Sequence, residues 1–77
     1  MNADELAQHN AVRLAQHNEQ KALDKLKTAK GRLPALAHDP ILNAAQIQAV
    51  QAEIVTLEEA YRLARIATLQ AQIAELE

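Results

Sequence analysis

Residues 31–40 read Gly-Arg-Leu-Pro-Ala-Leu-Ala-His-Asp-Pro, and this stretch decides the fold. It holds the single glycine and both prolines of the 77-residue chain. Gly31 is typical of the left-handed residue that follows a helix, and Pro34 disfavours helical backbone in the residue before it. Asp39 and Pro40 are typical of the N-cap and first position of a new helix. We therefore predict a connection over residues 31–40 between two helices.

The segments on either side of this stretch contain no glycine or proline. Asn2 and Glu5 have the spacing of a capping box, in which each side chain caps the backbone of the other. A second cap is possible at Asn43, with Gln46 three residues later. The sequence predicts one helix over residues 3–30 and a second over residues 41–76.

Two long helices joined by one connection predict an all-α fold, a coiled-coil-like antiparallel helical hairpin that forms a single domain over residues 1–77. At 1.5 Å per residue the second helix would span roughly 50 Å and the first roughly 42 Å. The first helix would then reach only to about residue 68 of the second. We expect the last turns of the chain to have no neighbour within the hairpin.

The contact between the two helices is predicted from apolar residues three and four positions apart, which share one face of a helix. In the second helix this spacing is regular from residue 47 onward. In the first helix the apolar face is narrow and rich in alanine. The predicted intrachain seam consists of Leu14, Ala22, Leu26, Ile47, Val50, Ile54 and Leu57.

A second apolar line begins where the first ends. Ile66, Leu69, Ile73 and Leu76 keep the same spacing but project from the side of the helix that is polar in earlier turns. A helix that is apolar on several sides is buried on several sides, and a lone hairpin offers only one neighbour. We predict that these four residues bind another protein chain, either a different protein or a second copy, with Tyr61 as the main anchor.

Catalysis is not expected from this composition. The chain has no serine or cysteine to act as a nucleophile, and its single glycine excludes a phosphate-binding loop. His9 and His17 are eight residues apart, about 80° around a helix, whereas helical metal ligands favour a spacing of four. We predict no catalytic, cofactor-binding or metal-binding residues, no cofactor and no small-molecule substrate.

Nucleic acid and membrane are not expected partners either. The net charge is −2, and the basic residues between Lys21 and Arg32 are spread around the helix without an aromatic side chain to stack on a base. No apolar run approaches about 18 residues, and the acidic start, Asp4 and Glu5, does not resemble a secretory signal. We expect a cytoplasmic protein.

Three short stretches resemble a known family. They are Ala22-Leu23-Asp24-Lys25-Leu26-Lys27, the glutamines at 46, 48 and 51, and Leu57-Glu58-Glu59-Ala60. In these the chain is similar to the small co-chaperones of type III secretion needle subunits, the YscE/PscE-like proteins. The resemblance covers about two-thirds of the chain. The chain departs from the family in its long 31–40 connection, in the lack of an aromatic residue beside the glutamines of the second predicted helix, and in its extended C-terminus. It implies a helical hairpin that helps another chaperone to keep a needle subunit soluble in the cytoplasm.

The sequence therefore predicts a non-enzymatic protein–protein interaction module, a co-chaperone or adaptor. A homo-oligomeric coiled-coil protein of a phage or secretion assembly remains open, because it would use the same apolar line symmetrically. An RNA-binding hairpin is a third alternative, which would require lysines that converge on one face and binding that depends strongly on salt.

Overall fold

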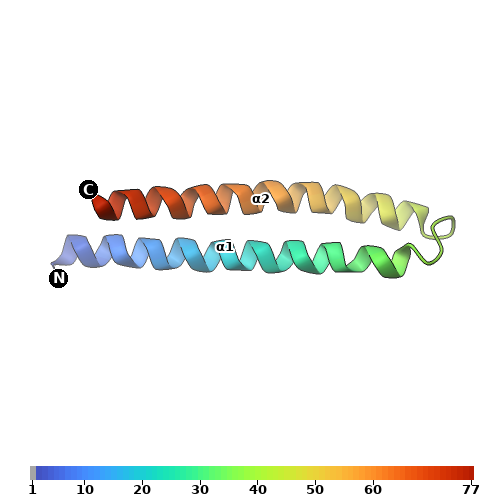
Figure 1. Cartoon of the computed structure of the whole chain (residues 1–77), viewed down its shortest axis with the longest axis horizontal. Coiled ribbons are helices and arrows are strands. Elements are labelled where there is room, and N and C mark those ends of the chain that lie inside the picture. Colours follow the sequence, from blue (N-terminus) through green and yellow to red (C-terminus); the bar gives the residue numbers. More distant parts are fainter. Residues whose placement is uncertain (1) are drawn as a thin grey trace.

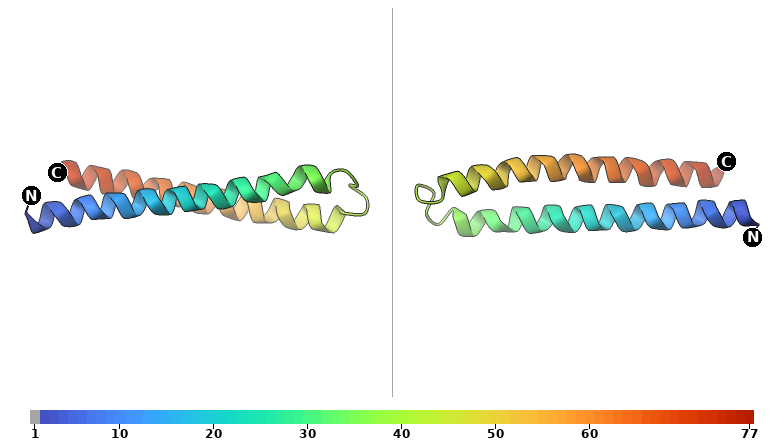
Figure 2. Two further views of the ribbon diagram at one scale, coloured as in Figure 1. Left: turned by 90° about the horizontal axis from the view of Figure 1, so that it is seen from below. Right: turned by 180° about the vertical axis from the view of Figure 1, so that it is seen from behind.

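The computed structural model describes residues 2–77 as two long helices and one connection. Helix α1 spans Ala3–Leu36 and helix α2 spans Ala44–Leu76. The helices run antiparallel and side by side over their whole length, so that the start of α1 and the end of α2 lie at one end of the rod (Figures 1 and 2). The rod measures 60 × 14 × 12 Å. The prediction of an all-α antiparallel hairpin is confirmed; only the first residue of the expected domain 1–77 lies outside the described part.

The start of α1 has the predicted cap. The side-chain oxygen of Asn2 accepts a hydrogen bond from the backbone N–H of Glu5 at 2.8 Å. This bond satisfies one of the N–H groups that a helix leaves unpaired at its beginning, and acidic residues in the first turn complement the helix dipole.

The end of α1 was predicted wrongly. The helix does not stop at residue 30 but continues through Gly31 and Pro34 to Leu36, and Gly31 does not adopt a positive φ. Leu33 and Leu36 pack against the buried cluster between the helices. Full burial of a leucine contributes about 1.5–3 kcal/mol, and these two are partly buried. Together they offset a large part of the roughly 3 kcal/mol that a proline costs inside a helix.

The connection is therefore shorter than predicted, residues 37–43 instead of 31–40, and α2 begins at Ala44 instead of residue 41. Asp39 does cap a turn, since its carboxylate accepts from the N–H of Leu42 at 3.1 Å, but that turn ends before α2 begins. Asn43 occupies the N-cap position without a side-chain bond to α2. Its side-chain amide instead donates to the backbone oxygen of Leu36 at 3.1 Å.

Because α1 is longer and α2 shorter than predicted, the two helices have nearly equal lengths. The expected overhang of α2 beyond residue 68 is wrong. His9, in the second turn of α1, lies 3.4 Å from the carboxylate of Glu75, in the last turn of α2. The final turns of α2 thus have α1 beside them.

The buried cluster lies in the half of the rod near the connection. Its four members are Leu26, Ala29, Val50 and Ile54, and four partly buried residues pack against them: Leu33, Leu36, Leu57 and Tyr61. Of the predicted seam, Ala22 and Ile47 are half-buried between the helices, and Leu26, Val50, Ile54 and Leu57 belong to this group. Leu14 is a wrong prediction, because its side chain is 61% exposed. It precedes Leu26 by twelve residues, which places it about 120° around the helix.

Candidate protein-interaction surface

The seam of α2 continues beyond the residues predicted for it. After Tyr61 and Ala64, the burial pattern proceeds with the same spacing through Thr68, which is 5% exposed, and Ala71. The Thr68 hydroxyl donates to the backbone oxygen of Ala64 at 3.2 Å, so the buried oxygen is not left unpaired. Sequence reasoning missed both positions because threonine and alanine carry little apolar signal, although their 3–4 spacing from Ala64 was visible.

The matching seam of α1 has the same period of three and four residues. Its buried or half-buried positions are Val12, Ala15, Glu19, Ala22, Leu26, Ala29, Leu33 and Leu36. Both helices therefore repeat every seven residues, which is the pattern of a coiled coil. The register set by the Arg32–Glu53 and His9–Glu75 contacts brings Ala22 to within about two residues of the level of Tyr61 along the rod.

This seam is unequal along its length. The half near the connection contains all members of the buried cluster. The half near the chain ends is lined by Ala15, Glu19, Ala64 and Ala71, and only Val12 and Thr68 are buried there. Small and charged residues bury little apolar surface, so this second half contributes less to the stability of the hairpin.

The large apolar residues of that second half lie on the outside. Ile66, Leu69, Ile73 and Leu76 are 38%, 48%, 57% and 88% exposed, and they follow one another at three and four residues on the face of α2 that points away from α1. We call these four residues the outer stripe. Isolated surface leucines are ordinary, but a regular line of four on one face is typical of a surface that another helix covers.

Tyr61, the predicted anchor, has a different position from the outer stripe. It is half-buried and packs against the cluster between α1 and α2. Its ring is therefore used mainly inside the hairpin. Its role in binding a partner remains a prediction.

One ion pair separates the outer stripe from the first half of α2. The guanidinium of Arg62 donates from Nε to one oxygen of Glu59 at 3.0 Å and from Nη2 to the other oxygen. The hydrogen bond from Arg62 lowers the pKa of the Glu59 carboxyl from its ordinary value, and the same bond raises the pKa of Arg62. Both groups are exposed to solvent, so their ion pair contributes little to the stability of the fold.

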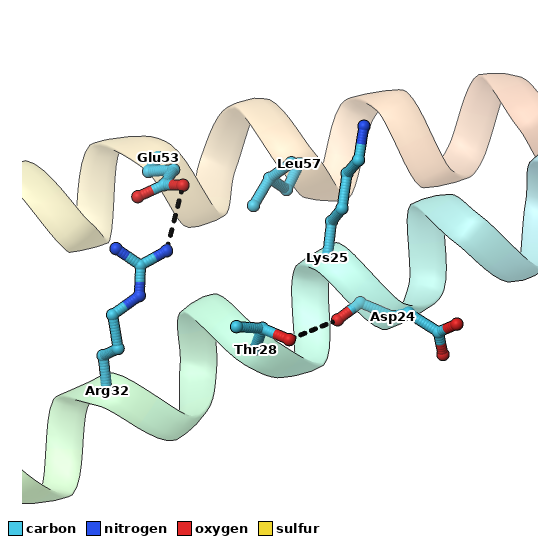
Figure 3. A pocket seen from close by; sticks show the side chains of 6 residues that line it. All are labelled: Asp24, Lys25, Thr28, Arg32, Glu53 and Leu57. Carbon is cyan, nitrogen blue, oxygen red and sulfur yellow. Dashed lines mark hydrogen bonds and ion pairs between the residues drawn. The ribbon is translucent and has the colours of Figure 1, made fainter.

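A shallow hollow of about 280 Å³ lies along one side of the seam (Figure 3). Across it, Nη2 of Arg32 donates to Oε1 of Glu53 at 3.1 Å, while Lys25 extends toward α2 beside Leu57. The Thr28 hydroxyl donates to the backbone oxygen of Asp24 within α1. The hollow lies at or below the lower end of the volume range of ligand pockets, and one ion pair, Arg32–Glu53, spans it from helix to helix. Its evident role is to hold the register of the hairpin.

The histidines and the charged residues of the described chain do not come together to form a metal site. Within residues 2–77, no three His, Cys, Asp or Glu side chains come close enough to hold a metal ion. His9 is paired with Glu75, and one of the basic residues of α1, Arg32, is paired with Glu53. Neither described helix is long and apolar enough to cross a membrane.

Comparison with known proteins gave no match to a family model, a curated protein or a solved structure.

The hairpin exposes more surface than a compact protein of the same mass. The chain exposes 5757 Å². A folded monomer of 8.5 kDa exposes about 4,700 Å² by the usual scaling with mass. The excess follows from the elongated shape of the hairpin, which measures 60 × 14 × 12 Å. A two-helix rod with five buried apolar residues leaves this area uncovered.

Proposed function

We propose that this chain is a non-enzymatic helical-hairpin module that binds another polypeptide through the outer stripe on α2. The observation that carries the proposal is the position of Ile66, Leu69, Ile73 and Leu76. They form a regular apolar line on the exposed side of α2, in the half where the seam with α1 is thinnest. Burial of the part of these side chains that is still exposed would contribute roughly 25 cal/mol for each Å² of apolar surface removed from water.

The partner that suits this surface is an apolar face of another helix. The 3–4 spacing of the outer stripe is that of a coiled-coil seam, which accepts side chains from a helix laid along it. In this proposal α1 supports α2, and the connection with its capping bonds holds the two in register. A co-chaperone or adaptor role in a cytoplasmic secretion assembly is the finer form of the proposal, supported by the stretches that resemble needle-subunit co-chaperones.

The proposal can be tested with a photo-crosslinking amino acid placed at Ile73 in the cell that makes the protein. We expect irradiation to join the chain to another polypeptide. The same amino acid at Lys27, which is exposed on α1, should give no adduct. Equal adducts at both positions, or none at position 73, would show that the outer stripe is not a binding surface.

A double substitution provides the second test. Leu69→Asp with Ile73→Asp should abolish association and the adduct while helicity by circular dichroism is retained, because both residues are exposed on the hairpin. The matched control is Leu6→Asp with Leu14→Asp, which adds the same charge at two exposed leucines of α1. Association that survives the first variant would remove the proposed surface.

A further inference from the structure

The outer face of α2 has a pattern over the whole helix, not only in the outer stripe. Ten residues continue its spacing of three and four, and all ten are exposed: Ala45, Gln48, Ala52, Val55, Glu59, Arg62, Ile66, Leu69, Ile73 and Leu76. The first four are two alanines, one glutamine and Val55, the last four are the larger aliphatic residues of the outer stripe, and the Glu59–Arg62 pair lies between them. The face is thus divided into two unlike halves of equal length.

Such a face is complementary to itself when a second copy lies antiparallel. A two-fold axis between residues 60 and 61, near the middle of α2, sets Leu69 of one copy against Ala52 of the other and Leu76 against Ala45. It also sets Ile66 against Val55. In these three layers a large side chain meets a smaller one, which is how coiled-coil seams fill space without voids. The remaining apolar layer sets Ile73 against the side chain of Gln48.

The charges fit the same arrangement. At this register Glu59 of one copy is level with Arg62 of the other. The flanking Glu58 lies diagonally across from Arg65, two residues from level, so that the dimer would contain two Glu59–Arg62 pairs and two Glu58–Arg65 pairs. A parallel pair in register would instead place Glu59 against Glu59 and Arg62 against Arg62. A shift of one heptad in the antiparallel pair would set Arg62 against Ile66 or Ala52, and uncompensated buried charge is costly.

We propose that the occupant of the outer face is a second copy of this chain, with the two α2 helices packed antiparallel about a two-fold axis between residues 60 and 61. The two α1 helices then lie outside, and the dimer is an elongated four-helix assembly. This proposal rests on the proposed function, whose surface it assigns to one partner. The contact is isologous, the symmetry of most homodimers.

Disulfide crosslinking tests the geometry directly, because the native chain has no cysteine. The variant with both Ala52→Cys and Leu69→Cys should form a covalent dimer on mild oxidation, seen on a non-reducing gel. The two positions are about 25 Å apart along one helix, so they cannot bond within a chain. Either substitution alone should give no dimer, while an equal mixture of the two single variants should give the crosslinked heterodimer.

The matched control carries Asn10→Cys and Lys27→Cys. These positions have the same separation and are exposed on the outer side of α1. This variant should stay uncrosslinked. Efficient dimers from either single variant, or from the control as readily as from the Ala52 and Leu69 pair, would overturn the antiparallel register.

The flanking charges supply a test that leaves the apolar layers unchanged. Glu58→Arg should raise the dimer dissociation constant roughly three- to tenfold at low salt, because like charges then meet twice. Adding Arg65→Glu should restore the original value. Equal weakening by the single and double variants would contradict the pairing of these two positions.

Light scattering over a concentration series separates this proposal from the proposed function. A dimer that Leu69→Asp with Ile73→Asp converts to a monomer supports both. The chain could instead stay monomeric up to about 1 mM while the photo-crosslinker at Ile73 captures a different polypeptide. That result would show that the occupant is not a second copy, and the proposed binding surface would still stand. If neither method detects association, both the proposed function and the proposed dimer are wrong.

Discussion

The side-chain amide of Asn43 donates a hydrogen bond to the backbone oxygen of Leu36, joining the start of α2 to the end of α1. The last carbonyl groups of a helix have no partner within it, so this bond satisfies one of them from outside. The same carbonyl accepts from the N–H of Asp39 at 3.3 Å. The end of α1 and the start of α2 are thereby fixed together, although Asn43 does not cap its own helix with its side chain.

Asn43→Ala should lower the free energy of unfolding by about 1 kcal/mol, because the substitution removes the side-chain bond to Leu36. Urea denaturation followed by circular dichroism measures the change. Asn10→Ala, at an exposed position within α1, is the control and should change stability by less than about 0.5 kcal/mol. An effect of Asn43→Ala no larger than the control would mean that the bond contributes nothing in solution.

Gly31→Ala should stabilise the protein by about 0.5–1 kcal/mol. Gly31 lies inside α1 without a positive φ, and an added Cβ would meet no atom within 4 Å. Alanine restricts the unfolded chain and favours the helix, so both effects have the same sign. Thermal unfolding measures the gain. A loss of stability would indicate that α1 ends near residue 30, as the sequence alone predicts.

Ile54→Ala should lower the free energy of unfolding by about 2–5 kcal/mol, because Ile54 belongs to the small buried cluster. Leu14→Ala removes a similar volume from an exposed side chain and should cost far less. Both variants can be compared in one urea series. If the two substitutions had equal effects, the packing of α1 on α2 would differ from that described.

The ion pair of Glu59 predicts a pH dependence. The pKa of Glu59 in the folded protein is lowered from its ordinary value of 4.5 by the hydrogen bond from Arg62. The charged carboxylate therefore stabilises the helix at pH values above 4.5, and this contribution disappears as the pH falls through the lowered pKa. NMR titration of the Glu59 carboxyl carbon should show a pKa below 4.5. The substitution Arg62→Gln should raise the pKa of Glu59 toward its ordinary value. An unchanged pKa in that variant would exclude Arg62 as the cause.

The central seam of α2 was predictable from sequence because its signal is strong. Val50, Ile54 and Leu57 are aliphatic residues at regular spacing, and only one face of a helix can contain all of them. Thr68 and Ala71 were missed because their types are found equally on surfaces. Leu14 was assigned wrongly by residue type, although its spacing from Leu26 already placed it on another face.

The outer stripe also follows from sequence, since Ile66, Leu69, Ile73 and Leu76 share a face in any continuous helix. Sequence could not show that α1 lies beside this part of α2, because that depends on where each helix ends. Local signals favoured an end at Gly31. Leu33 and Leu36 pack against the buried cluster between the helices, and this packing offsets the cost of Pro34 within the extended helix.

The sequence by itself determined two helices, their antiparallel pairing and the existence of two apolar faces on α2. The helices and the apolar faces depend on residue type and spacing within short segments, and the short connection between two long helices leaves antiparallel pairing as the way to bury those faces. Only the tertiary structure decided where α1 ends, how the capping bonds of Asp39 and Asn43 are distributed, and which half of the rod contains the buried cluster. Those outcomes depend on contacts between residues far apart in the chain, which act together against the local preferences of glycine, proline and capping residues.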